Sequence, residues 1–589
     1  MKWDLTYLFK TESDFNSALE GINNKIDDLA SYKGKLGNLD SFVEYYTKEL
    51  EMEEKFVRVY QYASLRSDLN KKDQNSLMAL QRVFIAYNKL QTALSFEAPE
   101  LLSLGKEKVM GFINSNESLK QLTFNIEKLF RNNDHILNDS SERLLSNYSR
   151  VTKTPDDVYT SLTTGDFMAT PVKLSNKETV MVSTTNFNSL IADLDNPKDR
   201  KKVFEAVYNF YDEHKNTFAS VYNGIVQNDI ALAKSRNYKN SLEAHLYGNN
   251  IPLDVYYNLV KICNKKSKQV KEYIKFRKKV LGLKSYHTYD RFLSLAKDES
   301  KKYTYDEAKE LFFKSIDKFP QEFKDNAHEV LRDGFVDVLP QDGKRSGAYS
   351  SSVINLHPYI LLNFNDTLND CFTVAHEAGH SIHSMFSCKY QPQATQDYEI
   401  FVAEIASTFN EHNLLDYFIK SGNASKNEKI MLLQTALDDI VSTFYRQTLF
   451  AEFELEAHTK AENGEPLTHE VLSDIMIKLY KKYYGLNIEK ENVKKFVWAY
   501  IPHMYHTPFY VYQYATSFAA SFKLYNDVKN NVDGAFDRYL GLLKSGGSDY
   551  PTNLTKKAGV DFTKLDTFTA VTNRFDELFA ELKLVMEEK

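Results

Sequence analysis

Three residues beyond the middle of the chain have the types and the spacing of a metal site. His376, Glu377 and His380 stand in the order His-Glu-x-x-His. Residues i and i+4 lie one turn apart on the same face of an α-helix, so both histidines can bind one ion. Glu377 lies beside the pair and can reach a water molecule without being a ligand. The pattern therefore predicts a zinc ion bound on one helix.

The residues around this pattern favour a metal site over a chance match. Short patterns of this kind also arise by accident, most often in exposed, charged helices. Here the neighbours are apolar: Phe372, Val374, Ala375, Ala378, Ile382, Met385 and Phe386. Two histidines and a glutamate inside such a run would carry a large desolvation cost without partners. We therefore predict that one zinc ion is their partner.

His383 extends the pattern to His-x-x-x-His-x-x-His, but it is poorly placed to be the third ligand. Seven residues of helix rise by about 10.5 Å, too far for His376 and His383 to share one ion. No residue between His380 and His383 would break the helix. We predict that His383 supports the site, faces substrate or lines the wall of a cleft.

A second apolar helix, predicted over residues 398–419, carries the favoured third ligand. Glu404 is enclosed by Val402, Ala403, Ile405 and Ala406. A carboxylate buried in this way needs a cation or strong donors. Two histidines and one carboxylate, with water in the fourth position, form a catalytic zinc set.

Three other acids remain as alternatives to Glu404. Asp397 and Glu399 stand where the helix begins, so exposure or pairing with the helix dipole would explain them. Glu411 lies seven residues beyond Glu404, on the same face. From there it could orient a ligand histidine through the free ring N–H, or form an ordinary salt bridge.

Composition limits the class of protein. Of the 589 residues, 42% are apolar and 26% charged, which indicates a globular protein of more than one domain or one large multi-lobed body. The formal net charge of -6 argues against nucleic acid or an anionic membrane as the main partner. Gly 21 and Pro 13 are low for this length and favour long helices.

The start of the chain and its cysteines favour the cytoplasm. Residues 1–5 lack the apolar core of a signal peptide, and no long uncharged apolar run predicts a membrane span. Three widely spaced cysteines are not a disulfide framework and indicate a reducing compartment. They are Cys263, Cys371 and Cys388.

The rest of the chain is predicted to be mainly helical. An antiparallel helical hairpin is expected over residues 40–94, and helices again over 196–290. Strands are expected at 167–174 and 179–183, and at 353–356 and 359–364 near the metal pattern. No repeat or flexible linker is visible. We expect two parts of one body: an N-terminal helical lobe, 1–195, and a catalytic region, 196–589.

A glycine-bearing turn at residues 343–350 precedes the second pair of strands. It is not a phosphate-binding loop, because Val338 and Arg345 stand where that pattern needs glycine and serine or threonine. We expect the turn to present backbone near the active site. An extended peptide would then bind as an added strand near Gly347, Ala348 and Tyr349.

A segment rich in histidine and tyrosine lies towards the C-terminus. Its donors are His503, Tyr505, His506, Tyr510, Tyr512 and Tyr514. Pro508 suits the first turn of a helix. In a helix that follows, Tyr510 and Tyr514 share a face and Tyr512 points elsewhere. The alternative is an aromatic core whose hydroxyls are all hydrogen bonded.

At this point the chain resembles oligoendopeptidase F, of the thimet oligopeptidase superfamily of zinc peptidases. The resemblance covers nearly the whole chain. It is carried by residues 3–8, 343–350, 357–360, 376–380, 401–404, 501–505, 510–516, 544–548 and 558–561. It implies a mainly α, two-lobed helical ellipsoid with a deep substrate cleft, cytoplasmic cleavage of short peptides and exclusion of folded proteins.

The resemblance also implies roles for individual residues. His376, His380 and Glu404 match the zinc ligands, and Glu377 matches the general base. We expect His503 and Tyr510 to donate to the oxyanion of the transition state. Because Met504 stands where an aromatic residue is expected, the other tyrosines of the segment remain candidates: Tyr505, Tyr512 and Tyr514.

Two other functions are alternatives to a zinc endopeptidase of short peptides. A peptide-binding protein that has lost catalysis predicts a damaged motif, yet the histidines and glutamates of the motif are all intact. A secreted zinc protease that degrades folded proteins predicts a signal peptide. The sequence leaves the oligomeric state open.

Overall fold

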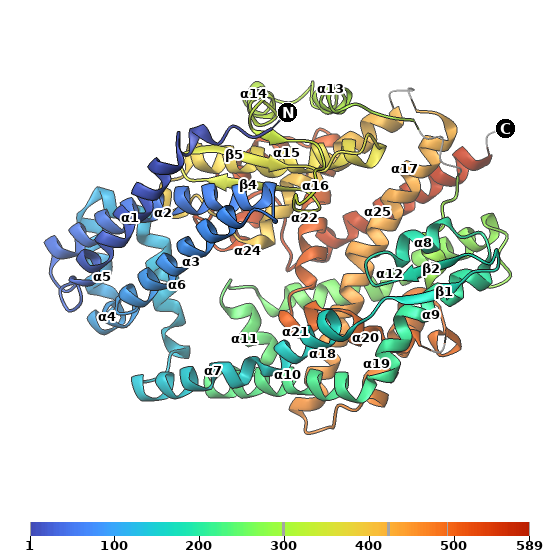
Figure 1. Cartoon of the computed structure of the whole chain (residues 1–589), viewed down its shortest axis with the longest axis horizontal. Helices are drawn as coiled ribbons and strands as arrows, with labels where there is room; N and C mark the ends of the chain where they lie inside the picture. Colours follow the sequence, from blue (N-terminus) through green and yellow to red (C-terminus); the bar gives the residue numbers. More distant parts are fainter. Residues whose placement is uncertain (1, 297–300, 421–423, 492, 588–589) are drawn as a thin grey trace. The chain divides into compact units, whose positions relative to one another are not determined.

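The protein, described by a computed structural model over residues 2–296, 301–420, 424–491 and 493–587, is mainly α-helical, as predicted (Figure 1). The chain forms two units, and each is assembled from three separate segments. Unit 1 comprises Met1–Asp134, Ser300–Lys420 and Leu524–Gly559, and unit 2 comprises His135–Glu299, Ser421–Lys523 and Val560–Lys589. The division expected near residue 195 and the two-lobed shape with its cleft remain predictions.

Unit 1 holds the helices that surround the metal pattern. Their bounds are α1 (Glu12–Ala30), α2 (Leu39–Leu69), α3 (Gln74–Leu94), α4 (Glu97–Leu104), α5 (Lys106–Ser115), α6 (Thr123–Arg131), α13 (Tyr305–Ser315), α14 (Gln321–Val330), α15 (Leu368–Tyr390), α16 (Ile400–Lys420), α23 (Ala535–Leu543) and α24 (Pro551–Lys557). The predicted hairpin is confirmed: α2 ends at Leu69, and α3 begins after Asp73, whose carboxylate accepts hydrogen bonds from the backbone N–H groups of Asn75 and Ser76. Phe42, Val59 and Val83 are buried in the core of this unit.

A three-stranded sheet lies against α15 in unit 1 (Figure 1). Its order is β3 (Val336–Asp337), β5 (Leu356–Leu361), β4 (Tyr349–Val353), with β3 parallel and β4 antiparallel to β5. The small sheet expected near the metal pattern is therefore present. The Trp3 indole N–H donates to the Ile360 carbonyl at 2.8 Å, which ties the start of the chain to the sheet.

The predicted bounds of these strands were wrong by several residues. Residues 353–356 were expected to be a strand, but the chain turns there, and Val353 pairs with Leu356 across the turn. The reason is Asn355, whose φ of 56° lies in the left-handed region that asparagine tolerates better than most residues. The strand before the turn therefore begins earlier, at Tyr349.

Unit 2 is built mainly from long helices around α12. Their bounds are α7 (Asp139–Thr160), α8 (Phe187–Asp193), α9 (Pro197–Glu213), α10 (Lys215–Ser235), α11 (Ser241–Tyr247), α12 (Leu253–Val280), α17 (Lys426–Asp439), α18 (Arg446–Glu462), α19 (His469–Tyr484), α20 (Val497–Tyr500), α21 (His503–His506) and α25 (Leu565–Glu587). Helix α12 packs against α18, α19 and α25. The predicted hairpin of strands is confirmed as β1 (Thr170–Lys173) paired with β2 (Thr179–Val182).

Unit 2 also contains a π-helical turn and two ion pairs of buried arginines. A π-helical turn, η7 (Ile440–Tyr445), joins α17 to α18 without a break. Two buried arginines pair with acids: Arg200 with Asp290 at 3.1 Å, and Arg277 with Asp438 at 3.3 Å. The helix α22 (Tyr512–Lys529) begins in unit 2 and ends in unit 1.

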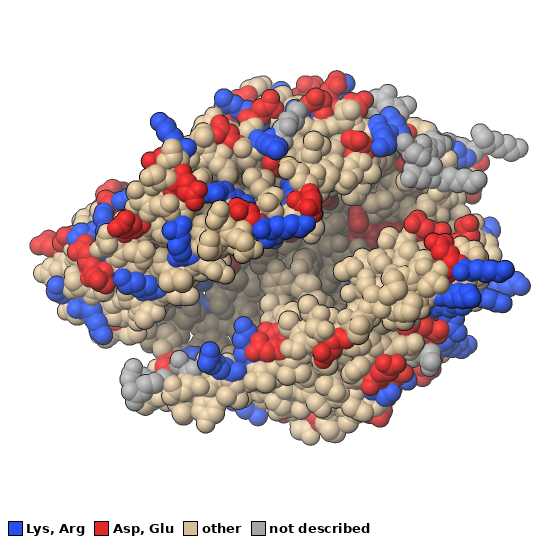
Figure 2. All heavy atoms as spheres, viewed as in Figure 1, with Lys and Arg blue, Asp and Glu red and all other residues tan. Residues whose placement is uncertain are grey.

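Charges of both signs are mixed over the face drawn in Figure 2, without a large area of one sign. This agrees with the near balance of 74 basic and 80 acidic residues in the sequence. Within the described part of the chain, no helix has both the length and the apolar character that crossing a membrane requires.

Candidate metal centre

The helix that carries the metal pattern is well defined at its N-terminus. Thr367 precedes α15 and forms a capping box with Asp370: the Asp370 N–H donates to Thr367 Oγ1 at 3.2 Å, and the Thr367 N–H donates to Asp370 Oδ2 at 2.9 Å. Two backbone donors that a helix start leaves unpaired are thereby satisfied. The helix then continues to Tyr390 and holds the two histidines of the pattern one turn apart.

A very close approach of α16 to α15 brings the third ligand to the histidines. At Gly379, an added Cβ atom would lie 2.5 Å from the Ala406 carbonyl oxygen and 2.6 Å from the Ser407 Cα. Only glycine fits there. One turn away, Asn410 Nδ2 donates to the Ala375 carbonyl at 3.1 Å and fixes the two helices together.

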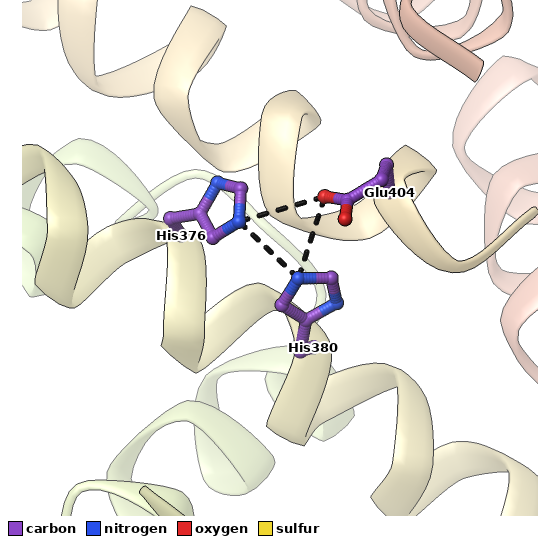
Figure 3. Close-up of side chains that lie close together, drawn as sticks. All are labelled: His376, His380 and Glu404. Atoms are coloured by element: carbon purple, nitrogen blue, oxygen red, sulfur yellow. Dashed lines mark hydrogen bonds and ion pairs between the residues drawn. The ribbon is translucent and has the colours of Figure 1, made fainter. Parts of the chain in front are cut away.

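Three donor atoms converge at this crossing (Figure 3). His376 Nε2 lies 3.2 Å from His380 Nε2, and Glu404 Oε2 lies 3.5 Å from the first and 3.4 Å from the second. In a tetrahedral zinc site with bonds of about 2.0–2.1 Å, neighbouring donor atoms are about 3.3–3.4 Å apart. The donor types and their separations therefore fit one zinc ion.

Glu411 lies on the other side of the first histidine. Its Oε1 is 2.8 Å from His376 Nδ1, so Nδ1–H donates to Glu411 and Nε2 is the ring nitrogen directed at Glu404. Burial lowers the pKa of His376, but the hydrogen bond to Glu411 and its charge outweigh burial and raise that pKa to about 9. This is the orienting position that the sequence indicated for Glu411.

The pKa of Glu404 reflects the same crowding of donors. Burial raises this pKa, but the hydrogen bond and charge of His380, together with the charge of His376, lower it to about 2. The carboxylate is thus held in its ionised form. The side chains of His376 and Glu404 are 25% and 32% exposed, so the site is accessible from outside.

Glu377 is placed differently from the three converging donors. It is 5% exposed, and its Oε2 atom has no hydrogen-bond partner among the described residues. Burial raises the pKa of Glu377, against the charges of His376 and His380, which lower it. A buried carboxylate oxygen without a protein partner is costly, so it needs a water molecule or another group to bond to.

The other two acids considered as ligands lie in different surroundings. Glu399 forms an ion pair with Lys128, at 2.8 Å between Nζ and Oε1. Asp397 accepts a hydrogen bond from the Tyr398 N–H at 2.9 Å. Among the acids weighed from the sequence, the structure brings Glu404 to the histidines as a third donor.

His383 lies in the packed interior. It is 1% exposed, and its ring stacks on Tyr398 with centroids 3.8 Å apart. Burial lowers its pKa to about 3, so the ring is neutral. The stacking on Tyr398 accounts for the position of this ring.

The segment predicted to contact substrate starts at an edge strand. Gly347 has a φ of 82°, and its carbonyl accepts from Asn363 Nδ2 at 2.7 Å. Tyr349 opens β4, which pairs only with β5 in the sheet of the described residues. Ser350 Oγ lies 2.8 Å from Ser381 Oγ on α15, so β4 runs beside the metal helix. Ala348, between Gly347 and Tyr349, is half-buried.

In unit 2, three side chains of the histidine and tyrosine segment gather into one cluster. The Tyr514 hydroxyl lies 3.2 Å from His503 Nε2, and the rings of Tyr510 and Tyr514 are 5.5 Å apart. Tyr505 and Tyr512 instead belong to the core. The ring centroid of Tyr505 lies 3.9 Å from that of Tyr159, and the ring centroid of Tyr512 lies 5.2 Å from that of Tyr256. Tyr510 and Tyr514 meet as expected, but the helical reason was wrong: Pro508 lies in a turn, and α22 begins only at Tyr512, so Tyr510 precedes the helix.

Sequence reasoning missed two residues that position these groups. Gly379 is one; its signal was a glycine inside an apolar helix, where glycine costs about 1 kcal/mol relative to alanine. Glu454 is the other: its buried Oε1 accepts from the Phe509 N–H at 2.9 Å and holds Phe509 at a φ of 54°, just before Tyr510. A glutamate on an ordinary helix gives no comparable signal.

Comparisons with known proteins cover the whole chain. The family model described as "Peptidase family M3" matches residues 190–573, and the model described as "Oligopeptidase F" matches residues 100–168. The chain is 36% identical to oligopeptidase PepF of Bacillus subtilis, over 100% of this chain and 88% of that protein. It is 35% identical to an oligoendopeptidase F homolog of Borreliella burgdorferi, over 100% and 98%.

A solved structure is similar over the same length. The crystal structure of oligoendopeptidase-F from Enterococcus faecium matches with a TM-score of 0.76 and 28% sequence identity. The match covers 98% of this chain and 100% of that chain.

We predict that Glu404→Ala loses zinc whereas His383→Ala retains it. The first change removes one of three converging donors, and the second removes a stacked ring that contacts Tyr398. Metal analysis after dialysis gives the zinc-to-protein ratio, and thermal unfolding checks that each variant is folded. A metal-free His383→Ala together with a metal-loaded Glu404→Ala would show that the ligand set is wrong.

Proposed function

Because the chain belongs to peptidase family M3 and is a metalloendopeptidase of the oligoendopeptidase F type, we propose that it hydrolyses short peptides with one zinc ion and Glu377 as general base. The observation that carries this proposal is the crossing of α15 and α16. There, two imidazole nitrogens and one carboxylate oxygen face a common point beside a glutamate whose second oxygen has no partner in the described structure.

His376, His380 and Glu404 would hold the ion. Zinc bound there would polarise the scissile carbonyl and lower the pKa of a water molecule to about 7. Glu377 takes the proton of the attacking water and passes it to the leaving amine. Its burial suits that role, because a carboxylate whose pKa is raised towards the working pH is a stronger base and can still release the proton afterwards.

Glu411 acts on this chemistry through His376. By accepting a hydrogen bond from His376 Nδ1–H, Glu411 favours the tautomer whose Nε2 would bind the ion. It also fixes the orientation of the ring, since a short hydrogen bond at one nitrogen sets the direction of the other.

We propose that His503 and Tyr510 stabilise the negative charge that develops on the substrate carbonyl. Tyr514 supports them, because its hydroxyl lies within hydrogen-bonding distance of His503 Nε2. Burial lowers the pKa of His503, so the neutral ring donates or accepts one proton at Nε2 as needed. Tyr505 and Tyr512 are left out of this role, since both are buried among other aromatic rings.

We propose that substrate lies along the free edge of β4. An edge strand offers backbone N–H and C=O groups that an extended peptide can pair with, and such pairing needs little side-chain specificity. The open stretch begins at Ala348 and Tyr349. It ends near Ser352, whose carbonyl already accepts from Gln61 Nε2 at 3.0 Å.

The compartment we propose is the cytoplasm. All three cysteines are free thiols. Free thiols are typical of proteins that work in a reducing compartment, where short peptides left by protein turnover are the substrates at hand.

We predict that Glu377→Gln keeps zinc and loses turnover, because it removes a base but no ligand. A general base typically contributes about 10²–10⁴ in rate. Mass spectrometry of a digested peptide library of mixed length gives the activity, with and without a chelator, and shows internal cleavage and the length limit. Near-normal turnover by the zinc-loaded variant would exclude Glu377 as the base.

We predict that N-methylation of a substrate at one or two backbone positions beside the cleaved bond raises KM sharply, since each methyl group removes a donor that pairs with β4. Methylation at alternate positions, whose N–H groups point away, should be tolerated. Uniform tolerance along the peptide would rule out binding as an added strand.

We predict that Tyr510→Phe lowers kcat by about 10²–10³ with little change in KM, because the lost hydroxyl meets charge present only in the transition state. Tyr505→Phe and Tyr512→Phe are the matched controls and should lower stability with nearly normal kcat. If Tyr514→Phe alone lost activity, the donor would be Tyr514. Normal kcat in all four variants and in His503→Ala would make the segment structural.

A further inference from the structure

Unit 2 contains two adjoining cavities lined by cations. Their volumes are about 70 and 100 Å³, and both walls include Thr288, Arg291, Arg446 and Lys494. These residues come from distant parts of the sequence: Thr288 and Arg291 from η5 (Thr288–Phe292), Arg446 from α18 and Lys494 from η9 (Lys494–Phe496). Much of the remaining wall is aromatic, with Tyr208, Tyr480, Tyr484 and Tyr500.

The three cations have no carboxylate within ion-pair distance in the described part of the chain. Lys494 is 7% exposed, and its Nζ donates to the Tyr208 hydroxyl at 2.8 Å. Arg291 and Arg446 lie over the rings of Phe292 and Phe450, at 4.4 and 5.2 Å from Cζ to the ring centroid. Burial and the charges of Arg446 and Arg291 all lower the pKa of Lys494.

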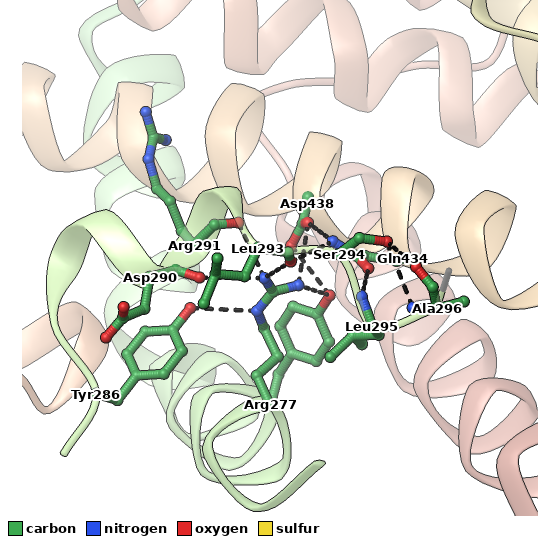
Figure 4. A network of polar contacts seen from close by, with 11 residues as sticks. Arg277, Tyr286, Asp290, Arg291, Leu293, Ser294, Leu295, Ala296, Gln434 and Asp438 are labelled. Carbon is green, nitrogen blue, oxygen red and sulfur yellow. Dashed lines mark hydrogen bonds and ion pairs between the residues drawn. The ribbon is translucent and has the colours of Figure 1, made fainter. Parts of the chain in front are cut away.

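The acids near these cations are already engaged. Asp438 lies 3.3 Å from Arg277, which also donates to the backbone carbonyls of Arg291 and Leu293. Figure 4 shows that the Arg291 side chain points away from this network. Glu491 accepts from the Thr288 N–H at 2.8 Å and lies 3.5 Å from His287 Nδ1.

Lys494 is buried and Arg291 and Arg446 are half-buried, and placing like charges side by side in such surroundings is costly unless a counterion offsets them. Arg277 has its counterion in Asp438, and the other three cations surround empty volume instead. By the same measure one water molecule needs only about 10–15 Å³, so each cavity has room for a group larger than water. A second observation is the π-helical turn η7, which lies between Asp438 and Arg446 in the wall; π-helical turns occur frequently at functional sites.

We propose that this cavity binds a small inorganic oxyanion of the phosphate or sulfate type between Arg291, Arg446 and Lys494. The planar fork of a guanidinium group matches two oxygens of such an anion, and the ammonium group adds a point charge. A halide would use the charge but not the forks. The bound anion would join η5, α18 and η9 by offsetting the mutual repulsion of Arg291, Arg446 and Lys494.

The test is isothermal titration calorimetry of the full-length holoenzyme with inorganic phosphate, in a buffer without chloride or sulfate. Lys494→Met and Arg446→Gln each remove one cation from the wall. Lys495→Met removes the same charge one residue away, outside both cavities, and is the matched control. We expect phosphate to bind the wild type and Lys495→Met alike, with affinity reduced about 10–100-fold in the other two, the range for one charged hydrogen bond.

Sulfate and chloride titrations identify the type of anion. Sulfate should compete with phosphate and chloride should not; binding of chloride alone would overturn the assignment to an oxyanion. Absence of phosphate binding, or equal binding by all variants, as expected if phosphate contacts the metal centre instead, would overturn the site. Should Lys494→Met fail to fold, Arg446→Gln decides the result, because Arg446 is only half-buried.

Discussion

The metal centre depends on how closely two helices can approach at Gly379. With no Cβ at this position, the backbone of α15 lies directly against Ala406 and Ser407 of α16. Any larger residue would push the helices apart, and Glu404, less than one turn before Ser407, would withdraw from the two imidazoles. Glycine in mid-helix costs about 1 kcal/mol. That cost is offset by an arrangement in which two helices alone supply all three converging donors.

The same two helices also carry the groups that act on protons. Glu411 fixes the tautomer of His376 from one side, and Glu377 keeps a carboxylate oxygen unpaired on the other. The three converging donors, Glu411 and Glu377 therefore all lie on one helix–helix contact, which is also joined by the hydrogen bond from Asn410 Nδ2 to the Ala375 carbonyl. Outside the two helices lie the edge strand β4 and the loop before Tyr510, where Glu454 accepts a hydrogen bond from the Phe509 N–H.

Features that depend on residues close together in the sequence could be predicted, and features that depend on tertiary packing could not. Helical periodicity is local, so it placed His376 and His380 on one face and excluded His383 by axial rise alone. The apolar neighbours of Glu404 favoured it over Asp397, Glu399 and Glu411, but the convergence of its carboxylate on the histidines depends on how α16 crosses α15. Strand bounds failed at Asn355, where one left-handed residue moves the turn. The cationic cavity was invisible, because Arg291, Arg446 and Lys494 are brought together only by tertiary packing.

The division of each unit into three chain segments has a consequence for biosynthesis. Unit 1 is completed by residues 524–559, and there the Gly547 N–H donates to the Thr395 carbonyl at 2.9 Å, in the connection between α15 and α16. At about 5–20 residues per second, a ribosome needs roughly 8–30 s to travel the 150 or so residues between them. For most of that time α15 and α16 have both been synthesised while their connection lacks this hydrogen bond. The two apolar helices of the nascent chain must therefore avoid binding to other proteins until the segment around Gly547 has been made.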